Sequence, residues 1–226
     1  MRAMILAAGL GTRMRPLTDS CPKPLLKVNG KPLIEYQIER LVEAGVKDIV
    51  INHAYLGDQI EAYVGDGAKW GAHVQYSAEP SSEPLETGGG IFNALEKVSP
   101  DGQAFLVVNG DIWIDLDYAE LVEGHLKGLV HLVMVNNPDH NPTGDFHLTE
   151  NGQLLASGDQ RSTFSGVSIL NPELFNDCQA GAFKLAPLFR QAMEQHQASG
   201  QLYQGYWLDV GTPQRLNELE QHLKNR

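Results

Sequence analysis

The sequence predicts an α/β protein, a three-layer α/β/α sandwich around a Rossmann-like sheet that is mostly parallel but mixed. Short apolar runs alternate with segments of helical length through the first 135 residues, a rhythm typical of a parallel sheet covered by helices. The apolar run over residues 104–108 is unbroken, as expected for a central strand buried on both faces. Residues 137–168 are rich in Asn, Gly, Asp and Ser, which favours antiparallel strands and loops.

The predicted elements follow one another without a linker, so we expect residues 1–226 to form a single domain. The first strand, over residues 2–7, is an apolar run that ends at a glycine-rich loop. In the helix that follows, Pro32 occupies the first turn, apolar residues recur at helical spacing, and Gly45 ends the element. Thr212 is the expected N-cap of the last helix. The same patterns predict strands over residues 48–52, 73–77, 104–108, 129–135 and 202–206, and helices over residues 56–63, 88–98, 118–127, 183–198 and 213–223.

The composition of the chain limits its partners. There are 17 Lys and Arg against 28 Asp and Glu, a net charge of −11, which disfavours nucleic acid and anionic membranes because both are bound through cations. Cys21 and Cys178 are too few for a disulfide framework and predict free thiols in a reducing compartment. The first apolar run breaks at Gly9, too early for a signal peptide, and no run reaches the ~18 apolar residues of a membrane helix. We therefore expect a cytoplasmic protein, of an oligomeric state that the sequence does not indicate.

A glycine-rich loop with nearby cations follows the first strand. Gly9 and Gly11 allow the backbone to turn closely around phosphates and to present N–H donors. Arg13, Arg15 and Lys23 add three cations in a chain that is acidic elsewhere. This combination favours a phosphate ligand over the alternative, a glycine turn flanked by ordinary surface residues.

Two familiar phosphate-binding loops do not fit this segment. A dinucleotide-binding loop needs a third glycine where the chain has Met14, and an acidic residue after the second strand, which ends at Asn52. The loop also lacks the Gly-Lys-Ser/Thr ending of a P-loop. A dehydrogenase is therefore disfavoured.

Two aspartates stand at predicted strand ends. Asp111 follows the buried strand over residues 104–108, and Asp209 precedes the last helix. Ligands of open parallel sheets bind outside the carboxyl ends of the strands, and Mg²⁺ binds through one or two carboxylates together with substrate phosphates. Either aspartate alone could simply cap the following turn, but the pair favours a metal site.

A third segment, Glu-Pro-Leu-Glu-Thr-Gly-Gly-Gly at residues 83–90, leads into a predicted helix. Its three glycines would let a flat base or a phosphate approach the backbone and the positive end of the helix dipole. The alternative is a flexible loop that precedes a helix.

The run Gly-x-Gly-Thr-Arg-x-x-Pro-Leu-Thr at residues 9–18, with Pro-Lys-Pro-Leu at residues 22–25, resembles the signature loop of the nucleotide-sugar pyrophosphorylases. The resemblance implies a nucleotide-diphospho-sugar transferase fold, Mg²⁺ as cofactor, and a nucleoside triphosphate and a sugar 1-phosphate as substrates. It implies that Arg13 neutralises the leaving pyrophosphate and that Lys23 binds the phosphate under attack. It further implies that Asp111 and Asp209 coordinate Mg²⁺. The remaining nucleotide-binding residues that it implies are Gly9, Gly11, Thr12, Glu79 and Gly88.

The nucleobase segment departs from the family pattern in an informative way. The family usually has Leu-Gly-Thr-Ala-Gly where this chain has Leu-Glu-Thr-Gly-Gly at residues 85–89, so the choice of base is left less certain. This departure, with Asn-Gly-Asp-x-Trp at residues 109–113 and Asn-His-Ala at residues 52–54, is similar to the N-acetylmuramate α-1-phosphate uridylyltransferases of bacterial cell-wall recycling. That group implies UTP as the nucleotide. Residues 1–136 would mainly bind the nucleotide and residues 137–226 mainly the sugar, with Asn109, Gly144 and Gly166 at the sugar.

The implied nucleophile is a phosphate oxygen of the sugar phosphate, so no Ser, Cys or His base is required. The scattered histidines lack metal-ligand spacing and are interpreted as structural or surface residues: His53, His73, His125, His131 and His147. Two alternatives stay open. One is another enzyme of the family, such as a mannose 1-phosphate guanylyltransferase or a cytidylyltransferase. The other is a regulatory module that binds sugar nucleotides without catalysis, which predicts the loss of Arg13 or of a metal aspartate, although all three are present.

Overall fold

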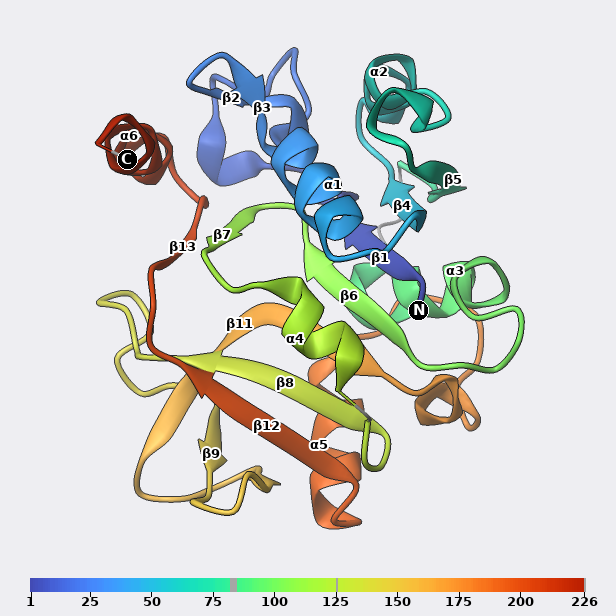
Figure 1. Ribbon diagram of the computed structural model, residues 1–226, viewed down its shortest axis with the longest axis vertical. Helices are drawn as coiled ribbons and strands as arrows, with labels where there is room; N and C mark the ends of the chain where they lie inside the picture. Colours follow the sequence, from blue (N-terminus) through green and yellow to red (C-terminus); the bar gives the residue numbers. More distant parts are fainter. Residues whose placement is uncertain (82–84, 125, 226) are drawn as a thin grey trace.

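A nine-stranded sheet forms the centre of the computed structural model, which describes residues 1–81, 85–124 and 126–225 (Figure 1). The expected segment over residues 83–90 is therefore described only from Leu85, and His125 lies outside the described residues. Four neighbouring strands run parallel, in the order β6 (Phe105–Asn109), β1 (Ala3–Leu6), β4 (Asp48–His53) and β5 (His73–Ala78). Beyond β6 the sheet continues with β11 (Arg161–Leu170), β8 (Val130–Val135) and β12 (Ala198–Tyr203).

The second part of the sheet is mixed, as predicted. β11 is antiparallel to both β6 and β8, whereas β12 is parallel to β8. The register between β11 and β8 shifts between Phe164 and Ser168, and the first residues of β11 pair with a small extension made of β9 (Phe146–Leu148) and β10 (Leu154–Leu155). The antiparallel strands and loops expected over residues 137–168 are thus confirmed.

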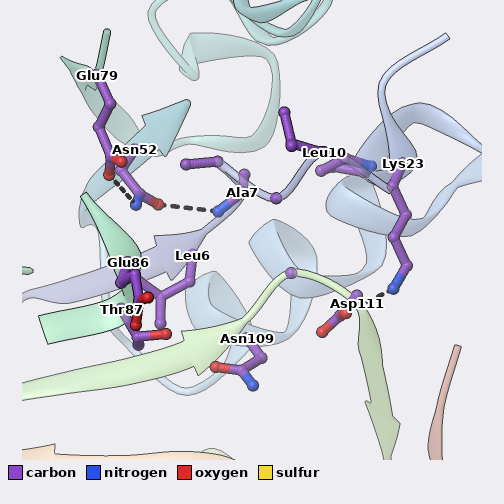
Figure 2. A pocket seen from close by; sticks show the side chains of 14 residues that line it. Leu6, Ala7, Leu10, Lys23, Asn52, Glu79, Glu86, Thr87, Asn109 and Asp111 are labelled. Carbon is purple, nitrogen blue, oxygen red and sulfur yellow. Dashed lines mark hydrogen bonds and ion pairs between the residues drawn. The ribbon is translucent and has the colours of Figure 1, made fainter. Parts of the chain in front are cut away.

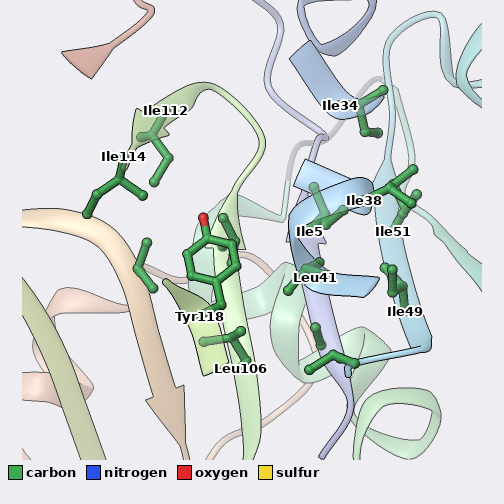
Figure 3. Packing of buried hydrophobic residues seen from close by; sticks show 14 of the residues in the cluster. Ile5, Ile34, Ile38, Leu41, Ile49, Ile51, Leu106, Ile112, Ile114 and Tyr118 are labelled. Atoms are coloured by element: carbon green, nitrogen blue, oxygen red, sulfur yellow. The ribbon is translucent and has the colours of Figure 1, made fainter. Parts of the chain in front are cut away.

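Helices cover both faces of the sheet and complete the predicted three-layer sandwich. Successive strand residues point to opposite faces, so Ile5 packs under one helical layer and Met4 under the other. The first layer contains α1 (Leu33–Glu43), α2 (Gly57–Val64) and α4 (Tyr118–Glu123), and Figure 3 shows α1 packing against β1 and β4. The second layer contains α3 (Glu86–Val98) and α5 (Ala186–Glu194). No helix in the described parts of the chain is long and apolar enough to cross a membrane.

A third, smaller core lies at one side of the sheet and joins the two ends of the chain. It contains Met14 from the glycine-rich loop, Trp113 from β7 (Ile112–Ile114), Leu208 from β13 (Trp207–Asp209) and Leu219 from α6 (Pro213–Lys224). The predicted N-cap of α6 is confirmed, because the hydroxyl of Thr212 accepts a hydrogen bond from the backbone N–H of Arg215. β7 and β13 pair with each other outside the main sheet.

Three elements have bounds that differ clearly from the prediction. The helix expected over residues 183–198 spans only Ala186–Glu194, because His196 adopts a left-handed conformation (φ 57°) that turns the chain out of the helix. The strand expected over residues 202–206 begins at Ala198 and ends at Tyr203, where its pairing with β8 ends. The helix expected over residues 118–127 already ends at Glu123. The pairs β7–β13 and β2–β3 (Lys27–Val28 and Lys31–Pro32) were not predicted, since strands of two or three residues show no periodicity.

The interior of the first helical layer gives a test of the packing. Gln37 of α1 is 1% exposed; its Nε2 donates to the carbonyl of Ile112 at 2.8 Å, and its Oε1 accepts from the hydroxyl of Tyr118 at 2.9 Å. Gln37→Leu would leave two buried polar groups without partners, so we expect the free energy of unfolding to fall by about 1–3 kcal/mol. Urea unfolding measures this loss. Gln191→Leu, on the exposed side of α5, should change it by no more than about 0.5 kcal/mol, and equal stabilities of the two variants would contradict the interpretation.

Candidate active site

A pocket of about 290 Å³ opens at the carboxyl ends of the parallel strands, the edge at which such sheets bind ligands. The ends of β1, β4 and β6 form its floor, and Glu86 and Thr87 in the first turn of α3 form one wall (Figure 2). Its lining residues are Leu6, Ala7, Ala8, Gly9, Leu10, Lys23, Pro24, Asn52, Glu79, Glu86, Thr87, Asn109, Gly110 and Asp111.

The glycine-rich loop borders this pocket and then turns away from it. Gly9 lines the pocket, and Gly11 has the left-handed φ of +63° that lets the chain enter the turn Thr12–Met14. The loop is held by Thr18, which is 1% exposed and whose hydroxyl donates to the carbonyl of Gly11 at 2.8 Å. The turn leaves Thr12 and Arg13 exposed beside the pocket rather than among the residues that line it.

A buried cation faces the first of the two predicted metal ligands. Lys23 is 8% exposed, and its Nζ lies 2.6 Å from Oδ2 of Asp111 in the wall of the pocket (Figure 2). The side chain of Asp111 itself is 39% exposed, so one side of its carboxylate remains open to a ligand. Because a buried ammonium needs a compensating negative charge, this ion pair holds Lys23 in the wall of the pocket.

The two predicted metal aspartates lie on neighbouring segments of the polypeptide. β7 and β13 pair with Ile112 opposite Asp209, and the N–H of Val210 donates to the carbonyl of Asp111 at 2.7 Å. The carboxylate of Asp209 pairs with the guanidinium of Arg215 and lies 3.0 Å from Nε2 of His140. This strand pair therefore joins residues separated by nearly 100 positions in the sequence, of which Asp111 lines the pocket and Asp209 does not.

Arg13 reaches the same place from the glycine-rich loop. A Cβ added at Gly211 would lie 3.4 Å from Cζ of Arg13, 2.8 Å from Nη2 of Arg215 and 3.2 Å from Oδ2 of Asp209. Only a residue without a side chain leaves room for this cluster. Two guanidinium groups and one carboxylate thus meet beside the pocket, where the cations could bind a phosphate group.

The donor set around the two aspartates suits magnesium in the way the sequence implies. In the described part of the chain no group of three His, Cys, Asp or Glu side chains could hold a metal ion by itself. Mg²⁺ does not need such a cage, because it keeps several waters and takes substrate phosphates as ligands beside one or two carboxylates. Asp111 and Asp209 would supply those carboxylates.

A buried amide links the strand ends at the other side of the pocket. Asn52 is 3% exposed; its Oδ1 accepts from the N–H of Ala7 at 2.9 Å, and its Nδ2 donates to Oε1 of Glu79 at 2.6 Å (Figure 2). Burial raises the pKa of the Glu79 carboxyl above its usual range, although the hydrogen bond from Asn52 opposes this shift. Glu79 is therefore held in one orientation in the wall of the pocket.

The glycines at the start of α3 serve close packing. A Cβ added at Gly88 would lie 2.5 Å from the ring of Phe183, and one at Gly89 would overlap the carbonyl oxygen of Gly181. At Gly90 it would lie 2.5 Å from Oε1 of Glu79. Gly88, expected at the nucleotide, packs against Phe183, whereas Glu86 and Thr87 line the pocket.

The residues expected at the sugar lie on adjoining segments, and only Asn109 lines the pocket. Gly166 (φ +88°) passes so close that an added Cβ would lie 2.7 Å from Nδ2 of Asn109. A Cβ added at Gly144 (φ +62°) would lie 2.6 Å from the carbonyl oxygen of Arg161. Gly166 therefore packs against Asn109, whereas Gly144 packs against the backbone of Arg161, and neither glycine lines the pocket.

The histidines that the structure describes have structural contacts, with one exception. His53 pairs with Glu61, and His131 contacts Ser199 and Gln201 across β8 and β12. His73 lies 3.5 Å from Asp48, and His147 contacts the carbonyl of Gln160. The exception is His140, which contacts Asp209 and was not singled out in the sequence.

Sequence reasoning also missed Asn52 and Arg215 as site residues. Asn52 ends a predicted strand at the ligand-binding edge, so the strand-end rule could have found it. Arg215 lies six residues after Asp209 in the first turn of α6, and no spacing rule points to it.

Comparison with known proteins agrees with this geometry. The nucleotidyl transferase family matches residues 2–146. An N-acetylmuramate alpha-1-phosphate uridylyltransferase of Neisseria meningitidis is 50% identical over 97% of each chain. A mannose-1-phosphate guanyltransferase beta-A of Xenopus laevis is 32% identical over 94% of this chain, which spans 62% of that protein. Among solved structures, HddC of Yersinia pseudotuberculosis, complexed with GMP-PN, superposes with a TM-score of 0.78 at 25% identity and covers 98% of this chain and 99% of its own. The predicted nucleotide-diphospho-sugar transferase fold is confirmed.

The contact between Gly90 and Glu79 gives a test of the pocket. In Gly90→Ala the new Cβ would displace the Glu79 carboxyl and crowd Nδ2 of Asn52 at 3.0 Å, while α3 would gain up to about 1 kcal/mol of helix propensity. We expect the thermal midpoint to change little and the dissociation constant for UTP, measured by calorimetry, to rise about tenfold.

The matched control for Gly90→Ala is Glu96→Ala, an exposed position of the same helix. It should leave both the thermal midpoint and UTP binding unchanged. Unaltered UTP binding in Gly90→Ala would exclude the wall formed by Asn52 and Glu79 from the nucleotide site.

Proposed function

Because this chain belongs to the nucleotidyl transferase family, we propose that it transfers UMP from UTP to N-acetyl-α-muramate 1-phosphate, forming UDP-N-acetylmuramate and pyrophosphate. The observation that carries the proposal is that the Lys23–Asp111 pair lines one pocket and that Asp209 and the Arg13 turn lie next to that pair. The name of the Neisseria meningitidis relative supports UTP and the muramate sugar, because the identity extends over nearly the whole of both chains. We assign the reaction to cytoplasmic peptidoglycan recycling.

The chemistry is a single displacement at phosphorus. An anionic oxygen of the sugar phosphate forms a bond to the α-phosphorus of UTP, and the bond from that phosphorus to the oxygen bridging to the β-phosphorus breaks. The electron pair of the broken bond leaves with pyrophosphate. Since the nucleophile is already ionised, the protein needs no general base. Its contribution is alignment of the two substrates and neutralisation of charge.

The cations at the edge of the pocket suit this task. Lys23 is buried and rigidly held at the pocket, which makes it suitable for binding the phosphate under attack. Arg13 stands farther out beside Arg215, where the departing pyrophosphate would pass. Gly9, Gly11 and Thr12 would offer backbone N–H groups to the triphosphate.

Asp111 and Asp209 would hold Mg²⁺. When bound, the ion would neutralise phosphate charge and help to align the two substrates. The same carboxylates form ion pairs with Lys23 and Arg215.

The wall formed by Asn52 and Glu79 is suited to a nucleobase. The carboxyl of Glu79 is fixed by Asn52 and could accept the N–H of uracil. Guanine also presents N–H donors, so this wall does not by itself distinguish UTP from GTP. The choice of base therefore rests on the near relative and requires a direct test.

Removal of single charged groups tests the assigned roles. Arg13→Ala and Asp111→Asn should each lower kcat by roughly 10²–10³, because each removes one preorganised charge from the reacting phosphates. Pyrophosphate release from UTP and the sugar phosphate gives the rate, and circular dichroism checks the fold. The controls are Lys47→Ala and Asp101→Asn, at exposed positions that do not line the pocket, and both should keep near wild-type rates. A near-normal rate in either test variant would remove that residue from the mechanism.

A substrate screen tests the proposed specificity. We expect pyrophosphate release with N-acetylmuramate 1-phosphate to be fastest with UTP among UTP, GTP, CTP and dTTP, and to stop when EDTA removes Mg²⁺. A preference for GTP with mannose 1-phosphate would favour the guanylyltransferase alternative. Nucleotide binding without turnover of any pair would favour a regulatory module.

A further inference from the structure

A second pocket, of about 430 Å³, adjoins the first on the α5 side of the sheet. The two pockets share four lining residues, Leu6, Glu86, Thr87 and Asn109, so a ligand that fills the first can extend into the second past Asn109. A volume of this size is ample for a substituent of a sugar. Nothing in the displacement described above uses this space.

Three aromatic rings form part of the wall of the second pocket. Phe146, Phe164 and Phe189 line it, and the rings of Phe164 and Phe189 meet edge to face with centroids 5.6 Å apart. One buried polar atom interrupts the apolar wall. Ser168 is 1% exposed, and its Oγ has no hydrogen-bond partner among the described residues. An unpaired hydroxyl of this kind is costly unless a ligand or a water contacts it.

Two cations line the same pocket, Lys184 and Arg190. The guanidinium of Arg190 lies over the ring of Phe146, 5.6 Å from its centroid, and is thus partly engaged. Two carboxylates are also present. Asp145 is held by the N–H of Phe164 at 2.8 Å, whereas Glu86 lies at the border with the first pocket. Lys184 is therefore the cation best suited to a new anionic partner.

Backbone hydrogen bonds hold the residue before Lys184 at the start of α3. The N–H of Phe183 donates to the carbonyl of Leu85 at 3.1 Å, and the N–H of Gly89 donates to the carbonyl of Phe183 at 3.1 Å. The ring of Phe183 also fills the space that a side chain at Gly88 would need. Lys184 thus follows a residue that is fixed to the start of α3.

We propose that the second pocket receives the lactyl group of the sugar substrate and that Lys184 binds its carboxylate. This inference rests on the proposed function, since N-acetylmuramate 1-phosphate carries an acidic ether substituent, the lactyl group, in addition to its phosphate. The aromatic walls contact the methyl group of the lactyl unit, and Ser168 offers its hydroxyl to a polar atom of the ligand. Lys184 is thereby a specificity-determining residue, which separates N-acetylmuramate from sugars without the acid.

Two products that differ only in the lactyl group test the assignment: UDP-N-acetylmuramate and UDP-N-acetylglucosamine. We expect the wild type to bind the first more tightly in calorimetry. Lys184→Met should weaken binding of UDP-N-acetylmuramate about tenfold and leave that of UDP-N-acetylglucosamine within about twofold, because only the first loses a charged hydrogen bond. Lys184→Arg should restore most of the preference, since it keeps the positive charge.

Two matched variants control for charge. Arg161→Met removes an exposed cation on β11 near Gly144, and Lys47→Met removes an exposed cation just before β4 that lines neither pocket. Both should keep the wild-type preference. Loss of the preference in Arg161→Met but not in Lys184→Met would assign the carboxylate to the other cation and overturn the proposal. Equal weakening of both ligands in Lys184→Met would indicate a structural role and would also overturn it.

Turnover by the wild type separates this inference from the proposed function. If the wild type converts N-acetylmuramate 1-phosphate and UTP but Lys184→Met retains the full preference for UDP-N-acetylmuramate, the subsite is wrong and the function stands. If the wild type binds the two products equally, the subsite is likewise wrong. If the wild type does not convert N-acetylmuramate 1-phosphate with any triphosphate, the function and the subsite fail together.

Discussion

The pairing of β7 with β13 is the contact on which the geometry of the site depends. Together with the backbone hydrogen bond from the N–H of Val210 to the carbonyl of Asp111, this pairing brings the segment after the central strand together with a segment close to the carboxyl terminus. Around it, the small third core packs the glycine-rich loop and α6. Because all three segments share this core, the turn that carries Arg13 and the two aspartates are held in one rigid arrangement.

Sequence patterns predict most strands of the main sheet, but they do not predict the short strands β7 and β13 outside it. The buried strands of the first half and helices such as α1 have enough residues for a period to be visible, and these elements are confirmed within a few residues. The end of α5 was missed because His196, neither Gly nor Pro, takes the left-handed conformation that ends the helix. β7 and β13 are too short to show a pattern, although they join the two aspartates.

The residues of the candidate site could be predicted where a motif or a strand end marks them in the sequence. Asp111 and Asp209 stand at strand ends, and the glycine-rich loop has a long motif, so each could be identified from adjacent residues. The partners of those residues come from elsewhere in the chain. Arg215 and His140 reach Asp209 through tertiary contacts, and Asn52 joins Ala7 to Glu79 across three separate segments. Such contacts depend on the folded topology, which a linear pattern does not contain.

Gly88, Gly89 and Gly90 near the start of α3 limit which substitutions this protein tolerates. Each glycine lowers helix propensity by roughly 1 kcal/mol relative to alanine, so the first turn of α3 is held by its neighbours rather than by its own sequence. Ordinary stabilising engineering replaces such glycines with alanine. Here the ring of Phe183, the backbone of Gly181 and the carboxyl of Glu79 fill the space that a methyl group would need. In a deep mutational scan Gly88 and Gly89, which meet a ring and a backbone carbonyl, would thus be less tolerant than Gly90, which meets a side chain, so steric exclusion rather than chemistry sets the limit.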